Sequence, residues 1–414
     1  MKALVLGAGL AGVTTAYELS RDGLDVTVVD REDGPAMFTS FANAGLFAPG
    51  HAYAWSSPAA PGILLRSLWR GDQALRFRPS LDPNLYRWMV KFLAQCTPER
   101  AALNTSRKAR LCAYSQNMFH QTMARDPVNY DGNKGGLIYF YRSHAALKGA
   151  VERSSLLTQN GVELEVLDAD GAAEKDPALG PVKDQIAGAL YAPNDESGDA
   201  HIFTREMVKL CEKAGVKFHW NTEVQRFETE ANKVTGVMTD KTFYQPGIVV
   251  NALGVYSPHL ARQLSDDIPV YPVKGYSVTV PVAGRNNPPR IGGVDEENLV
   301  AYCPMGDRIR LTATAEFSGY RRGHKPADFR HMLDVARKLF PDGADFDDVT
   351  YWAGLRPMTP EGTPIFGRGK HSNLWYNTGL GHMGWTMSHG AARITADLIG
   401  GKTPAIPLDG MVLI

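Results

Sequence analysis

Cysteine is scarce in this chain of 414 residues: there are four, far apart in the sequence, at positions 96, 112, 211 and 303. No two of them form a C-x-x-C pair, and no two of the 11 histidines form an H-x-x-x-H or H-E-x-x-H pattern. The sequence therefore predicts neither a disulfide framework nor a metal site. Buried, unreactive thiols in a reducing compartment are the expected role of the cysteines.

An excess of either charge is also missing, because 44 Lys and Arg side chains balance 44 Asp and Glu side chains. A nucleic-acid-binding surface needs clustered basic charge, so no nucleic-acid partner is expected. No run reaches the roughly 18 apolar residues of a membrane-spanning helix. The glycines that interrupt the first apolar run argue against a signal peptide. We expect a cytoplasmic protein, and a peripheral contact with the inner face of the cell membrane stays open.

The hydrophobic fraction of 44% and the charged fraction of 21% are those of an ordinary globular protein, and the length favours two domains. Residues 3–6, 11–21 and 26–29 predict a strand, a helix and a strand, which together form a βαβ unit. Residues 61–125 predict a helical insertion whose many aromatic side chains serve core packing. The remaining pattern predicts β-structure at 136–142, 216–220, 224–238, 248–254, 270–281 and 299–315, and helices at 144–159, 204–214, 328–340 and 384–400.

A G-x-G-x-x-G motif, formed by Gly7, Gly9 and Gly12, lies between the first strand and the first helix. Gly7 permits the tight turn, Gly9 lets the backbone approach a pyrophosphate, and Gly12 lets the helix pack against the strand. The N–H groups at the start of the helix then face the phosphates. Asp30 ends the second strand about 20 residues further on, where its carboxylate can accept hydrogen bonds from a ribose. The motif in this context predicts dinucleotide binding.

A second glycine-rich segment, at 377–386, leads into the last predicted helix. Backbone N–H groups at such a helix start can bind the pyrimidine edge of a flavin, and the helix dipole favours the negative charge that gathers there on reduction. FAD enzymes of this architecture return to the cofactor late in the chain, so the two motifs together favour FAD over NAD. An ordinary glycine-rich helix entry is the alternative.

A third segment, at 351–360, places Arg356 between apolar residues and prolines, which is an unusual choice for a core loop. A guanidinium holds a carboxylate by two parallel hydrogen bonds and keeps its charge. Arg356 is therefore a candidate to bind the carboxylate of an amino acid. A surface salt bridge explains the residue equally well on sequence alone.

These segments, with 39–45, 193–199, 270–277, 354–360 and 384–387, resemble the FAD-dependent D-amino acid oxidase superfamily along essentially the whole chain. Within it, they are most similar to the small-subunit family of bacterial D-amino acid dehydrogenases. The resemblance implies an α/β (α+β) fold with two interleaved domains. A Rossmann-like FAD-binding domain would comprise 1–50, 145–265 and 350–414, and a mainly antiparallel β substrate domain with the helical insertion would comprise 51–144 and 266–349.

The resemblance also implies roles for single residues. Arg356 would bind the substrate carboxylate, Tyr276 would face the substrate, and His51 and His382 are candidates to assist. FAD would be bound without a covalent link by Gly7, Gly9, Leu10, Ala11, Gly12, Asp30, Arg31, Thr39, Ser40, Asn43, Ala44, Gly45, Val224, Gly254, Gly379, Gly381, His382, Met383, Gly384, Trp385 and Thr386. The chain departs from the family at Leu380 and His382, where the family has His and Thr, and at His51, where it has Tyr. The preferred amino acid therefore stays open.

The reaction implied is oxidative deamination of a small amino acid, expected to be the D-enantiomer, with hydride transfer to flavin N5 and formation of a 2-oxo acid and ammonia. The electron acceptor would be a quinone or another respiratory-chain component, or oxygen. One alternative is an oxygen-using enzyme similar to glycine or sarcosine oxidase, or a proline-type secondary-amine oxidase. Balanced charge argues against a flavin-containing RNA-modifying enzyme, and Arg356 argues against a non-catalytic FAD-binding protein.

Overall fold

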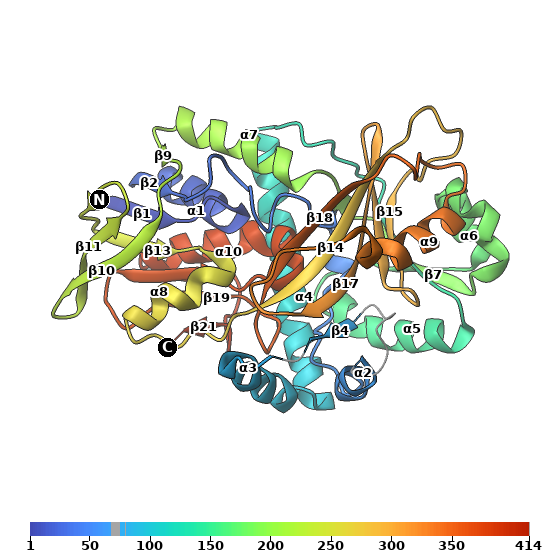
Figure 1. Cartoon of the computed structure of the whole chain (residues 1–414), viewed down its shortest axis with the longest axis horizontal. Helices are drawn as coiled ribbons and strands as arrows, with labels where there is room; N and C mark the ends of the chain where they lie inside the picture. Colours follow the sequence, from blue (N-terminus) through green and yellow to red (C-terminus); the bar gives the residue numbers. More distant parts are fainter. Residues whose placement is uncertain (68–74, 79, 414) are drawn as a thin grey trace.

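The chain folds around two large β-sheets, as seen in a computed structural model that describes residues 1–67, 75–78 and 80–413 (Figure 1). The first sheet has seven strands in the order β21-β19-β20-β13-β1-β2-β9, and only the β19–β20 pair is antiparallel. Its strands are β1 (Lys2–Leu6), β2 (Asp25–Val29), β9 (Lys217–His219), β13 (Ile248–Asn251), β19 (Ile365–Arg368), β20 (Leu374–Thr378) and β21 (Val412–Leu413).

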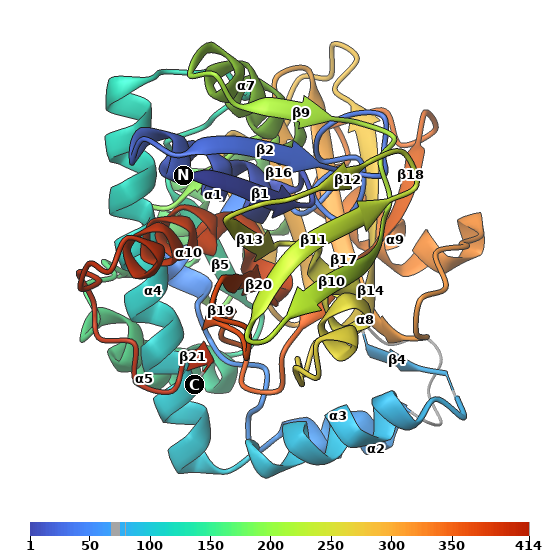
Figure 2. The same cartoon turned by 90° about the vertical axis from the view of Figure 1, so that its left-hand side faces the viewer.

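Both faces of this sheet are covered, because successive side chains of a buried strand point to opposite sides. Ala3 and Val5 of β1 pack against a helix layer, whereas Leu4 and Leu6 pack against a layer of β-structure. Figure 2 shows that second layer in front of the sheet. The helix layer contains α1 (Leu10–Arg21), α7 (Ala200–Lys213) and α10 (Gly384–Ile399), and the opposite layer contains α8 (Ser257–Gln263), β10 (Val224–Glu230), β11 (Lys233–Thr239) and β12 (Phe243–Tyr244).

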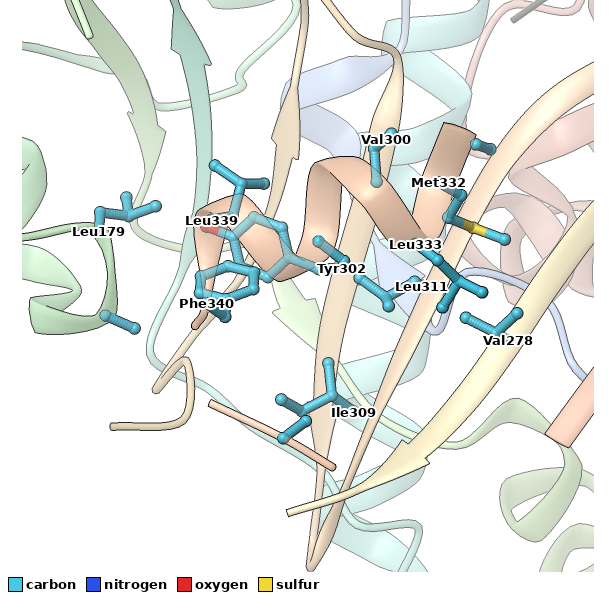
Figure 3. Packing of buried hydrophobic residues seen from close by; sticks show 14 of the residues in the cluster. Leu179, Val278, Val300, Tyr302, Ile309, Leu311, Met332, Leu333, Leu339 and Phe340 are labelled. Atoms are coloured by element: carbon cyan, nitrogen blue, oxygen red, sulfur yellow. The ribbon is translucent and has the colours of Figure 1, made fainter. Parts of the chain in front are cut away.

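The second sheet is mainly antiparallel and has nine strands. Helix α9 (Arg330–Leu339) packs on one of its faces, where Met332 and Leu333 meet Val278 and Leu311 (Figure 3). The strands are β4 (Leu75–Phe77), β5 (Leu137–Tyr141), β6 (Glu165–Leu167), β7 (Gly188–Ala192), β14 (Tyr271–Pro281), β15 (Gly292–Asp295), β16 (Val300–Met305), β17 (Arg308–Phe317) and β18 (Thr350–Met358).

The first part of the helical insertion lies at one edge of the molecule, at the bottom of both views (Figures 1 and 2). Its longest helix, α4, crosses the middle and packs on α10. Trp88 and Phe92 of α3 pack against Tyr271 and Phe317, which confirms that aromatic residues of the insertion serve core packing. The remaining elements are α2 (Ala60–Ser67), α3 (Pro83–Ala94), α4 (Pro98–Arg125), α5 (His144–Thr158), α6 (Ala169–Lys175), β3 (Leu46–Phe47), β8 (Glu196–Ser197), and the 3-10 helices η1 (Pro49–His51), η2 (Pro177–Gln185), η3 (Gly254–Tyr256), η4 (Pro326–Phe329) and η5 (Gly381–Met383).

The mixed α/β fold, the βαβ unit and the hairpin at 224–238 are confirmed. Three other expectations differ from the structure. Strand β4 interrupts the helical stretch predicted at 61–125, whose residues Leu68 and Trp69 lie outside the described residues. The segment with Arg356 is strand β18 rather than a core loop, because it pairs with β14 over nine residues. Strands β6, β7 and β18 join the nine-stranded sheet, although 145–265 and 350–414 were expected in the FAD-binding domain.

Within the described ranges, no helix combines the length and the apolar character needed to cross a membrane.

The turn between β1 and α1 leads to a first prediction, about stability. A Cβ atom added at Gly12 would lie 1.8 Å from the carbonyl oxygen of Gly7, which is backbone and cannot move aside, whereas one added at Gly9 meets only Ser40 Oγ at 3.5 Å. Gly12→Ala should therefore force α1 away from β1 and lower the free energy of unfolding by about 1–3 kcal/mol, the range of an overpacked core. Denaturant unfolding of the apoprotein measures this, and Gly9→Ala is the matched control. Equal stability of the Gly12→Ala variant and wild type would contradict this account of the turn.

Candidate functional site

A cavity of about 510 Å³ runs from the carboxyl ends of β1, β2 and β13 to the face of the nine-stranded sheet that α9 does not cover. Residues from the turn before α1, from the segment 36–44 and from the segment 378–386 line it. In open parallel sheets, ligands bind at the carboxyl ends of the strands, so the position of the cavity is that of a ligand site.

The β1–α1 turn lines one end of the cavity. Gly7 has φ +100°, which L side chains rarely adopt, and its N–H donates to the carbonyl of Val29 over 2.8 Å. Because only Ser40 Oγ comes near the position of a Cβ on Gly9, that residue is open towards the cavity, and Ser40 Oγ also accepts a bond of 3.3 Å from the N–H of Leu10. The turn and the start of α1 are thus shaped to receive a phosphate group.

Asp30, at the end of β2, holds this turn in place. Its carboxylate accepts hydrogen bonds from the N–H of Ala8 over 2.6 Å and from that of Glu32 over 2.9 Å. Burial raises the pKa of Asp30 above its ordinary value, and the two N–H donors oppose that shift. Each carboxylate oxygen retains a further lone pair, so Asp30 can still accept from a ligand hydroxyl in the cavity.

The segment 378–383, just before α10, lines another part of the cavity wall. Gly381 has φ +61°, and Gly384 opens α10. Thr386 in the first turn accepts a bond of 3.0 Å from the N–H of Ala48, which fixes the helix start against the segment 46–48. The positive end of the α10 dipole therefore lies at the cavity wall and favours a ligand that carries negative charge there.

Arg356 projects from β18 onto the sheet face that forms the far wall of the cavity. Its only hydrogen bond within the described chain is donated by Nη1 to the carbonyl of Thr314 over 3.0 Å. Burial lowers the pKa of Arg356 to about 10, so the guanidinium is still charged at neutral pH. No carboxylate of the described residues pairs with it. A half-buried cation of this kind is stabilised by an anionic partner, and the cavity that it lines is where one can bind.

Two irregularities of the sheet position this guanidinium. Gly275 and Gly354 pair across β14 and β18, and a Cβ on Gly275 would lie 2.5 Å from Cζ of Arg356. The missing side chain lets the guanidinium lie flat on the strand. A β-bulge in β17 turns Thr314 to φ +64°, and it is the carbonyl of this residue that accepts from Arg356.

His382 lies on the cavity wall near Arg356. Its ring stacks on Trp55, with 4.6 Å between centroids. Nζ of Lys108 is 3.2 Å from Nε2 of His382 and donates to the carbonyl of Tyr53 over 2.9 Å. Burial, and then the charge of Lys108, hold the pKa of His382 well below its ordinary value, so His382 is neutral.

His51 also lines the cavity, where it stacks on Tyr139. Its Nε2 is 2.7 Å from Oε1 of Glu296. Burial opposes a charge on His51, but the negative charge of Glu296 and the hydrogen bond to it together favour the charge, and the pKa of His51 lies above its ordinary value. Behind the ring, the hydroxyl of Tyr139 donates over 2.7 Å to Asp195, a carboxyl whose pKa burial raises to about 7.

Tyr276 borders the cavity, but its hydroxyl is turned to the protein interior and does not face the substrate position, contrary to expectation. The hydroxyl donates to Glu316 over 2.8 Å, and the ring packs on Phe329 below α9. The cause is the alternation of side chains along β14: Gly275 is on the face of Arg356, and the next residue must point to the other. The ring of Tyr276 therefore belongs to the core beneath the site.

The other expected residues are distributed as follows. All the candidate FAD contacts line the cavity except Gly12, Gly45 and Gly379, which are packed against protein atoms instead. Residues that the sequence did not indicate are Trp55, Lys108, Glu296 and Thr314. One sequence signal for this face of the sheet is a glycine on each strand, Gly275 and Gly354, which leaves room beside the Arg356 side chain. The others reach the site from distant segments and carry no local pattern.

A Rossmann-type turn, a carboxylate at the end of β2 and an arginine without an acidic partner on the facing sheet are the arrangement expected of a dinucleotide-dependent enzyme that acts on an anion. The profile of the FAD dependent oxidoreductase family matches residues 2–398, and the chain belongs to this family. It is 41% identical to D-amino acid dehydrogenase 2 of Mesorhizobium japonicum over 100% of this chain and 99% of that one. It is 42% identical to D-amino acid dehydrogenase of Paramagnetospirillum magneticum over 99% of this chain and 98% of that one.

Solved structures share the fold at low identity. Glycine oxidase from Geobacillus kaustophilus superposes with a TM-score of 0.76 at 20% identity, covering 100% of this chain and 98% of that one. L-proline dehydrogenase from P. horikoshii superposes with a TM-score of 0.74 at 19% identity, covering 99% and 95%. The cofactor of this family fits the cavity, because the open backbone at Gly9, the carboxylate of Asp30 and the start of α10 lie along one wall of it.

The contacts of Asp30 lead to a prediction about the cofactor. Asp30→Ala removes a charged acceptor from the ribose and leaves the N–H of Ala8 without its partner, so the affinity of the apoprotein for FAD should fall by about 1.5–3 kcal/mol, or roughly 10- to 150-fold. Titration of apoprotein with FAD, followed by flavin fluorescence, measures this. Asp30→Asn, which keeps one acceptor oxygen, should lose less. Wild-type affinity in the Ala variant would show that Asp30 does not contact the cofactor.

Proposed function

We propose that this chain is an FAD-dependent D-amino acid dehydrogenase, which converts a D-amino acid to a 2-oxo acid and ammonia. Relatives with this name match the whole chain at 41% and 42% identity. The single observation that carries the proposal is the guanidinium of Arg356, which is half-buried at the cavity wall without a carboxylate partner in the described chain. An amino-acid carboxylate supplies the missing charge and accepts two parallel hydrogen bonds.

The chain's own residues act by binding and orientation. Arg356 holds the carboxylate, and the stacked rings of Trp55 and His382 limit the room beside it, so that the α-hydrogen meets the cofactor in one orientation. Bound FAD supplies the acceptor for the hydride. We further propose that His51, adjacent to Glu296, takes the proton that the substrate ammonium loses before oxidation. Water then hydrolyses the released imino acid without help from the protein.

The cavity wall near Arg356 also favours a class of side chain. Val294, Ala301 and Ala315 line this end and are small and apolar. The acidic residues that line the cavity, Asp30, Glu32 and Glu223, all come from the ribose end, so a basic substrate side chain would find no partner beside Arg356. We propose a small or cyclic uncharged side chain.

For the electron acceptor we propose a quinone of the respiratory chain, reached by peripheral contact with the membrane. The names of the relatives support a dehydrogenase over an oxidase. The likeness to glycine oxidase and L-proline dehydrogenase concerns the fold alone at 19–20% identity. An enzyme similar to glycine oxidase, or a proline-type oxidase, is therefore not favoured.

Anaerobic reduction of the flavin tests the proposed function. D-Alanine and other small D-amino acids should bleach the flavin absorbance of the purified protein, and their L-enantiomers and D-lysine should do so much more slowly. Admission of air should then produce hydrogen peroxide more slowly than a soluble quinone reoxidises the flavin. Faster bleaching by L-amino acids, or none by any amino acid, would overturn the proposal, whereas rapid peroxide formation would overturn only the choice of acceptor.

The position of Arg356 leads to a prediction about kcat/KM. Arg356→Lys keeps the charge but loses the planar pair of donors, so one charge-assisted bond of about 1.5–3 kcal/mol is lost and kcat/KM for D-alanine should fall by roughly one to two powers of ten. Arg356→Ala should fall further. Gly275→Ala displaces the guanidinium without removing it, so this variant should also lower kcat/KM, through a higher KM. Flavin content is the control for folding. Wild-type kcat/KM in the Arg356→Ala variant would show that the carboxylate binds elsewhere.

A further inference from the structure

Lys108 is the one lysine of the described chain that is buried beside the candidate substrate site, and its position on α4 is unusual. Its side chain is 1% exposed, and no Asp or Glu of the described residues forms an ion pair with it. Burying an ammonium group without a carboxylate is costly. Its two polar contacts are the carbonyl of Tyr53 and Nε2 of His382.

The contact with His382 determines which ring nitrogen carries the proton. An ammonium group can only donate, so Nε2 of His382 must accept from Lys108, and the proton of the neutral ring is on Nδ1. Nδ1 makes no hydrogen bond with the described residues, and it is not enclosed by them, while the ring itself lines the cavity. His382 therefore presents an N–H donor close to Arg356, whose charge acts on the same ring.

We propose that Lys108 is a positioning residue that keeps His382 in the Nδ1–H tautomer, so that His382 and Arg356 together donate to the carboxylate of the substrate. The inference rests on the proposed function for the identity of that carboxylate. Stacking on Trp55 fixes the plane of the His382 ring, and Lys108 fixes its tautomer. The N–H donor of His382 is therefore in place before the substrate binds.

The surroundings of Lys108 give the pH dependence of this arrangement. Burial lowers its pKa to about 8. Cys112 on the same helix stays a thiol because burial raises its pKa to about 12, His382 stays neutral, and Arg356 stays charged below its pKa of about 10. Two further groups near Lys108 can change charge with pH: His51, whose pKa lies above its ordinary value beside Glu296, and the carboxyl of Asp195 behind it, whose pKa burial raises to about 7. Lys108 is an ammonium below pH 8 and an amine above it, so carboxylate affinity should fall as the pH rises through about 8.

Binding of pyruvate to the holoenzyme tests the proposal without turnover. Pyruvate is the 2-oxo acid of D-alanine, and its dissociation constant is read from the perturbation of the flavin spectrum. Lys108→Met, which keeps the unbranched stem, should raise this dissociation constant about tenfold at pH 7 and should abolish the loss of affinity as the pH rises through about 8. Lys148→Met removes the same charge from an exposed position on α5 and should leave the dissociation constant and its pH dependence unchanged.

A double-mutant cycle separates positioning from general electrostatics. His382→Phe should weaken pyruvate binding by itself, and Lys108→Met should add nothing in that background, because its effect acts through the ring. Additive losses would mean that Lys108 attracts the anion directly and would overturn the proposal. Unchanged pyruvate binding in Lys108→Met would overturn it as well.

The tautomer provides a readout that does not depend on any variant folding. In wild-type holoenzyme with ¹⁵N-labelled histidine, the signal of His382, assigned by its loss in His382→Phe, should show a protonated Nδ1 at pH 7. A protonated Nε2 would overturn the proposal. Failure of the proposed function looks different: the flavin would not be reduced by any D-amino acid, while pyruvate binding and its dependence on Lys108 would remain.

Discussion

The burial of positive charge without a carboxylate partner is the constraint on which the site depends. Arg356 and Lys108 both lie beside the cavity, and the described chain offers them backbone carbonyls, from Thr314 and Tyr53, in place of acidic side chains. Carbonyl dipoles reduce the cost of desolvation but do not cancel the charge. An anion bound at Arg356 would supply the charge that the carbonyl of Thr314 does not, and a bulge and a glycine pair hold the guanidinium at the cavity for it.

The cofactor end of the site could be predicted from the sequence because its geometry is local. The G-x-G-x-x-G turn and Asp30 lie within one βαβ unit, and the short distance along the chain determines where they meet in space. The substrate end could be predicted only in part. Residue type and resemblance indicate Arg356, but the prolines around it suggest a loop and hide the strand that pairs with β14.

Other parts of the site depend on register and on long-range packing. Tyr276 was expected to face the substrate, and a shift of one residue along β14 would place it there; only the pairing with β18 shows that Gly275 has that position. Lys108 reaches His382 from the middle of α4 because that helix packs on α10, which no local pattern predicts. The domain boundaries differ for the same reason: β6 and β7 lie far from β14 in sequence, but β5 and β15 connect them into one sheet.

Thr314 shows how a stability cost can be retained by function. A β-branched residue at φ +64° is strained by about 1–3 kcal/mol, and glycine would relieve that strain at once. Glycine would also let the peptide swing, and the carbonyl that holds Arg356 would lose its fixed direction. A search for more thermostable variants would therefore favour a change at 314 that a search for faster variants would reject. With the proposed role of Arg356, selection on stability and selection on catalysis would act on this one position in opposite directions.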